Sequence, residues 1–243
     1  MWFIAFLGLF TLAVAIGSEA TGTGLISTSM VKTLGKTLCL CLIAIAMDVV
    51  WGYCGILSLG HFAFFGIGGY AIGNQIFGVV GSSDFPWLWA FSDSLFLQLL
   101  MVVIVPGLLA LVFGWLAFRS RVTGVYLSIL TQAMTLALSL WLFQNDSGLR
   151  GNNGLSGLQN IPGYEDTSQA TTSLVFFMGS ALALALGYIL FAWVVSGKMG
   201  SVVQGIRDNE ARVRFLGYRV ERYKLFIFTL TAVIAGIAGA LYY

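Results

Sequence analysis

The side chains able to do chemistry are few, and three of them gather in one glycine-rich stretch. Ser58 and the chain's single histidine, His61, stand three residues apart, and Asp48 precedes them. A serine beside a histidine can act as a nucleophile with its general base, so a hydrolase is one interpretation. The same groups can instead offer hydrogen bonds to a polar solute in an apolar setting. Because no orienting acid other than Asp48 is evident, the hydrolase is the weaker hypothesis.

The stretch around these residues is too rich in glycine for a continuous helix. Glycines occupy positions 52, 55, 60, 66, 68, 69 and 73, and each weakens a helix by roughly 1 kcal/mol relative to alanine. A helix broken inside a membrane frees backbone groups, and such breaks build the substrate sites of transporters. We therefore predict that a substrate path is lined by Asp48, Gly52, Gly55, Ser58, Gly60 and His61. The alternatives are that Asp48 marks a helix end and that His61 is a packed ring.

A second polar feature follows about two helices later. Ser128, Thr131, Gln132, Thr135 and Ser139 fall on one face of a predicted helix over 122–145. Such a row should avoid lipid, so it either hydrogen-bonds neighbouring helices or lines a weakly polar conduit. We add Ser128 and Gln132 to the predicted path.

Composition indicates what positions these groups. Of 243 residues, 58% are hydrophobic and 9% charged, whereas soluble domains have about 25% charged residues. Charge-free windows long enough to cross a bilayer predict an all-α, polytopic transmembrane helical bundle with about seven membrane segments and one glycine-broken helix. They are 1–18, two within 37–83, where Asp48 is the single charge, 94–118, 122–145, 168–197 and 225–243.

The ends of the chain and its charges complete this prediction. Residues 1–243 form one transmembrane domain, its first helix retained, and further helices are expected after Tyr243 because no polar tail follows. The net charge of +2 gives no basic patch for nucleic acid. Three scattered cysteines provide no metal site.

Orientation follows from the basic residues. Most lie within 119–121 and 198–224, which we place in the cytoplasm, and the acidic connections 81–93 and 145–172 are placed outside. Alternation then puts Lys32 and Lys36 outside, where the rule disfavours them unless their side chains snorkel.

The cytoplasmic loop 198–224 contains signals for a short helix. Asp208 is a suitable N-cap, Glu210 favours the first turn, and Gly217 suits the position after the C-cap. Apolar residues among arginines then form a docking surface for a cytoplasmic partner; the alternative is an ordinary positively charged loop. The predicted coupling residues are Arg207, Asp208, Glu210, Arg212, Arg214, Phe215 and Gly217.

Three segments resemble signature regions of the permease subunits of branched-chain amino-acid type ABC importers. They are DVVWGYCGILSLGHFAFFGIGGYAIG, FRSRVTGVYLSILTQAMTLAL and QGIRDNEARVRFLGYRVERYKLFIFTLTAVIAGIAGALYY. Within that family, FQNDSGLRGNNGLSGL over 143–158 is similar to the external loop of the urea-transport permease.

The resemblance implies a multi-pass permease of the bacterial inner membrane that is not itself an enzyme and binds no cofactor. Its implied partners are a second homologous permease, ATP-binding subunits that use ATP, and a periplasmic solute-binding protein. Urea is the favoured solute, because an uncharged amide needs hydrogen bonds and no countercharge. A branched-chain amino acid is the alternative, since a broken helix can also offer a helix end to a charged group. A passive urea channel is the more distant one.

Overall fold

The computed structural model describes residues 2–19, 24–79, 95–120, 122, 124–143 and 169–242. This part of the chain is helical apart from its connections and one isolated bridge between Ser18 and Ile26. The all-α prediction is therefore confirmed. The predicted outer segments 81–93 and 145–168 lie outside the described residues.

The helices include one for each predicted window and one in the charged loop 198–224, and two of them begin several residues before their windows. They are α1 (Trp2–Gly17), α2 (Thr28–Asp48), the π-helical turn η2 (Val49–Tyr53), α3 (His61–Val79), α4 (Leu95–Arg119), α5 (Val125–Phe143), α6 (Gln169–Ser196), α7 (Lys198–Phe215) and α8 (Val220–Tyr242).

Five spans within the described residues are long and apolar enough to cross a membrane, by length and composition, against about seven predicted. They are Thr28–Tyr53, Leu99–Arg119, Val125–Phe143, Ala170–Ser196 and Val220–Tyr242. The other two predicted segments also form helices. However, α1 has only 16 residues, fewer than the about 20 that a bilayer core requires. Helix α3 begins only after a non-helical stretch. The chain is a multi-pass membrane protein.

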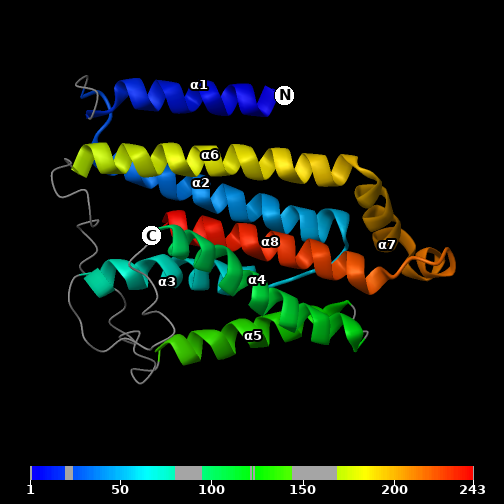
Figure 1. The fold of residues 1–243 in the computed structure, drawn as a ribbon. Coiled ribbons are helices and arrows are strands. Elements are labelled where there is room, and N and C mark those ends of the chain that lie inside the picture. Colours follow the sequence, from blue (N-terminus) through cyan, green and yellow to red (C-terminus); the bar gives the residue numbers. More distant parts are fainter. Residues whose placement is uncertain are drawn as a thin grey trace.

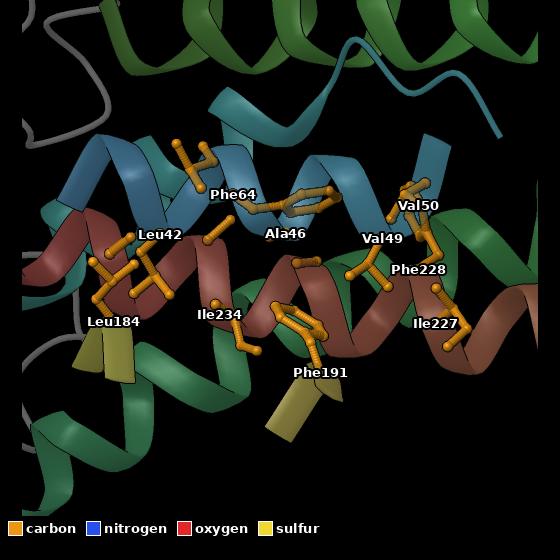
Figure 2. Packing of buried hydrophobic residues seen from close by; sticks show 14 of the residues in the cluster. Leu42, Ala46, Val49, Val50, Phe64, Leu184, Phe191, Ile227, Phe228 and Ile234 are labelled. Atoms are coloured by element: carbon orange, nitrogen blue, oxygen red, sulfur yellow. The ribbon is translucent and has the colours of Figure 1, made fainter. Parts of the chain in front are cut away.

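Helix α8 occupies the centre of the bundle, where α2, α3, α4 and α6 contact it (Figure 1). Figure 2 shows the resulting core, in which Phe64 of α3 and Phe228 of α8 are both fully enclosed. Their rings meet edge to face, with centroids 5.7 Å apart. Lipid is as apolar as these side chains, so close packing rather than water exclusion holds such helices together.

The closest helix contact is between α3 and α8, and it depends on glycine. A Cβ on Gly68 would overlap the carbonyl oxygen of Gly236, and one on Gly239 would overlap that of Phe65. Gly66, on the same helix, has nothing within 4 Å of an added Cβ. The face of α3 that meets α8 therefore passes through Gly68 and not through Gly66.

The charged segments lie at the two opposite ends of the bundle. The end of α4, the start of α5, η2 and α7 share one end, and the start of α2 lies at the other (Figure 1). Lys32 and Lys36 are therefore opposite α7, as alternation predicted. The Lys36 ammonium lies 5.1 Å from the centre of the Tyr242 ring, a cation–π contact that favours a cation at this position.

Candidate transport site and coupling segment

The predicted break in the membrane helix is present. Helix α2 continues through η2 to Tyr53, residues 55–60 have no helical structure, and α3 then begins at His61. Gly55 turns the chain with φ +69°, a left-handed conformation that glycine adopts without strain. Gly60 lies against α5, because a Cβ there would be 2.9 Å from the Thr131 carbonyl oxygen. We call residues 55–60 the broken segment.

The polar row of α5 satisfies the backbone of the broken segment. Ser128 Oγ donates to the Leu57 carbonyl at 2.7 Å, and the Leu59 N–H donates to Thr131 Oγ1 at 3.1 Å. Non-helical backbone at membrane depth requires such partners. The broken segment and the polar row are thus in contact. Two members of the row, Ser128 and Thr131, hydrogen-bond a neighbouring segment, as in the first predicted alternative, whereas Thr135 and Ser139 bond their own helix. Thr131 is the residue that the predicted path omitted.

Thr131→Val should destabilise the protein because it leaves the Leu59 N–H without an acceptor. An unpaired buried donor costs about 1–3 kcal/mol, so we expect a lower midpoint of thermal unfolding in detergent. Ser139→Ala is the matched control, since that hydroxyl donates only to the Leu136 carbonyl of its own helix. Equal melting of the two variants would contradict the role given to Thr131.

His61 joins the broken segment to α8. Its side chain is fully buried, with Nδ1 3.0 Å from Ser58 Oγ and Nε2 3.1 Å from Thr231 Oγ1. The Thr231 hydroxyl donates to carbonyls of its own helix, so it accepts from His61 Nε2–H, and Nδ1 accepts from Ser58. This is the packed-ring alternative considered for His61.

The hydrolase interpretation loses its geometric basis at this site. Ser58 and His61 are both buried. The ring nitrogen of His61 that is not paired with the serine meets the Thr231 hydroxyl, whereas in a catalytic triad the second ring nitrogen pairs with a carboxylate. The sequence gives no local signal for Thr231 as a partner of His61, because Thr231 lies in an apolar run of α8, far along the chain.

The remaining predicted path residues lie apart from this network. Asp48 is exposed at the end of α2, where its Oδ1 would be 3.0 Å from a Cβ on Gly52. Gln132 is exposed on α5, beside the buried Thr131. Their place on a substrate path stays a prediction.

The loop 198–224, predicted as cytoplasmic, is more helical than predicted, since α7 begins at Lys198. Asn209 interrupts this helix with φ −157° and ψ 93°, and its Oδ1 accepts the Arg212 N–H at 3.0 Å. The N-cap of the second part is therefore Asn209, and the prediction of Asp208 was wrong by one residue. Both residue types cap well, so local sequence could not choose between them.

The end of this helix is as predicted. Gly217 has φ +88°; its N–H bonds the Arg214 carbonyl and the Tyr218 N–H bonds that of Val213. These two bonds define a Schellman motif with glycine at C′.

An ion-pair cluster fixes the second part of α7 to α8. Glu210 contacts Arg214 and Lys224 at 2.7 Å each, and Arg214 also reaches Glu221 at 3.2 Å. Burial raises the pKa of Glu210, but the hydrogen bonds and charges of Lys224 and Arg214 outweigh it and hold that pKa below its usual value. Glu210 therefore stays ionised near neutral pH, and the cluster persists. The sequence analysis did not anticipate the roles of Lys224 and Glu221.

The outer face of α7 carries exposed apolar side chains and an arginine that takes no part in the ion-pair cluster. Phe215 is 92% exposed and Leu216 is exposed beside it, while Arg212 makes no ion pair within the described residues. Val213, by contrast, is buried against Ile206 and Val220. An exposed aromatic beside a free arginine is a typical centre of a protein interface.

Comparisons with known proteins show the family to which this chain belongs. Residues 29–243 match the family described as branched-chain amino acid transport system / permease component. The chain is similar to the high-affinity branched-chain amino acid transport system permease protein LivM of Escherichia coli, with 24% identity over 90% of this chain and 53% of the relative. The Salmonella typhimurium protein of that name gives the same identity and coverage. The chain thus spans about half the length of these curated relatives, and no solved structure matches it. The chain belongs to the family of branched-chain amino acid transport system permease components.

Proposed function

We propose that this chain is the membrane-spanning permease part of an ABC importer for branched-chain amino acids. The observation that carries the proposal is the broken segment, held between α5 and α8 within a chain of this permease family. The sequence favoured urea, but the similar proteins are named for branched-chain amino acids. The urea-like stretch over 143–158 lies outside the described residues except for Phe143. The amino acid is therefore the better-supported solute.

The chemistry of the break suits a zwitterion. An amino acid needs a positive partner for its carboxylate and acceptors for its ammonium group. Helix α3 begins at the break, and the positive end of a helix dipole favours a carboxylate. Backbone carbonyls of non-helical residues such as 55–60 supply acceptors in comparable sites.

The proposed transporter has several subunits. The family consists of permease components of a transport system, and the exposed face of α7 offers a surface on which another subunit can dock. ATP-binding subunits would seat Phe215 and Arg212 of α7 and would hydrolyse the ATP. A second permease would cover the exposed apolar faces, and a periplasmic binding protein would deliver solute to the end opposite α7. The whole would lie in the bacterial inner membrane and work by alternating access.

Competitive uptake tests the solute. Cells carrying the full set of subunits should take up labelled leucine, and unlabelled isoleucine or valine should compete while urea should not. Saturable uptake of urea, unaffected by leucine, would contradict the proposal.

Gln132→Leu should impair uptake while leaving assembly intact. The Gln132 side chain is exposed beside the α5 residues that hold the broken segment, and it offers an amide on the polar row of this helix. Losing a hydrogen bond to a charged solute group corresponds to about a tenfold decrease in uptake at low solute concentration. Leu136→Met, on the same helix, is the control. A normal uptake rate for Gln132→Leu would remove this residue from the path.

A further inference from the structure

Arg207 of α7 reaches into the end of the α2–η2 helix. Its Nη1 donates to the Gly52 carbonyl at 2.6 Å, and Asp208 holds the same guanidinium through Nε at 3.2 Å. Arg207 had been predicted as a coupling residue, and an ATPase contact was one role open to it. Its guanidinium instead bonds its own chain, although the side chain remains 47% exposed.

The Gly52 carbonyl lies at the end of a helix, where it requires a hydrogen-bond donor from outside that helix. Carbonyls at the end of a helix lack an N–H of their own helix. Those of Val49, Val50 and Trp51 accept from the N–H groups of residues 54–56. Gly52 comes next and receives the arginine, whose positive charge also suits the negative end of the helix dipole.

The stem of Arg207 contacts the first residue of the broken segment. A Cβ on Gly55 would lie 2.9 Å from Arg207 Cγ. Gly55 therefore both turns the chain and makes room for α7. From this point the segment continues to its bonds with Ser128 and Thr131 on α5 and, through His61, with Thr231 on α8.

The broken segment is thus the place where α5, α7 and α8 meet. The kink at Asn209 separates two attachments of α7. Before it, Arg207 bonds Gly52 of η2 and its stem contacts Gly55; after it, Glu210 binds Lys224 of α8. A force on the exposed face of α7 would act on both.

We propose that Arg207 is a positioning residue that carries movement of α7 to the broken segment, through its bond to Gly52 and its contact with Gly55. The inference rests on the proposed function, because it assigns the internal route by which a nucleotide-driven movement reaches the solute path. Arg207 acts on the path from within the chain and is not needed to hold the ATP-binding subunit.

Cys54 gives a direct readout, because it is buried between Gly52 and Gly55. With Cys39→Ser and Cys41→Ser, it is the single thiol of the chain. In the assembled transporter, its rate of modification by N-ethylmaleimide should change between the nucleotide-free and ATP-trapped states. In Arg207→Ala this difference should shrink by about tenfold or more, the effect of losing a hydrogen bond to a charged group. Arg207→Lys should restore part of it, and Lys198→Ala, an exposed cation on the same helix, should leave it unchanged.

The outcomes separate the hypotheses. Retained nucleotide dependence in Arg207→Ala overturns the inference, as does the absence of nucleotide dependence in a transporter that imports leucine. Loss of the ATP-binding subunit on purification of Arg207→Ala also overturns it, because Arg207 would then be a docking residue. If the unmodified transporter imports no branched-chain amino acid when ATP is present, the proposed function is contradicted instead.

Discussion

Gly239→Val is expected to prevent the bundle from folding. The added Cβ would overlap the Phe65 carbonyl oxygen of α3, and helix backbones that touch at glycine cannot separate without losing their packing. Overfilling a packed core usually costs about 1–3 kcal/mol, and a clash with backbone lies at or above the upper end. We expect little or no monodisperse protein after detergent extraction, measured by fluorescence-detected size-exclusion chromatography.

Gly66→Val provides the matched control. It makes the same chemical change on the partner helix, but nothing lies within 4 Å of the added Cβ. This variant should be extracted at nearly the normal yield. If Gly66→Val were lost and Gly239→Val recovered, the α3–α8 contact described here would be wrong.

The double variant Arg212→Ala with Phe215→Ala is expected to abolish energised uptake. Phe215 and Arg212 are exposed on α7, and each central interface residue of this type is worth about 2 kcal/mol or more. Together they correspond to a decrease in uptake of at least about 100-fold. Arg214 is left in place because it pairs with Glu210 and Glu221 within the chain, so its removal would also disturb the fold.

Two measurements distinguish lost docking from lost folding. The double variant should melt at the same temperature as the unmodified chain yet no longer retain the ATP-binding subunit on purification. Arg222→Ala, an exposed cation on neighbouring α8, should affect neither. Normal uptake in the double variant would refute the docking role of α7.

Much of this structure could be predicted from local sequence. Charge-free windows located the helices because lipid excludes charge, and glycine density located the break because it lowers helix stability. Gly217 was predictable as a helix end because only a left-handed residue completes that motif.

The missed features depend on distant contacts. The bond of His61 to Thr231 joins residues far apart in sequence, and no local pattern on α8 marks Thr231. The choice of Asn209 over Asp208 as a cap follows the position in which Glu210 meets Lys224. Gly68 meets the Gly236 carbonyl while Gly66 meets nothing within 4 Å, a difference set by how α3 is turned toward α8.

The central claim is that this chain provides a solute path moved by force received at α7. Transport into vesicles tests it most directly. The experiment compares the purified chain alone with the chain assembled with the proposed ATP-binding subunits, second permease and solute-binding protein. The account predicts that labelled leucine accumulates only in the assembled vesicles and only with ATP on the side of α7. Leucine or urea flux through the chain alone, without ATP, would contradict it and identify a passive channel.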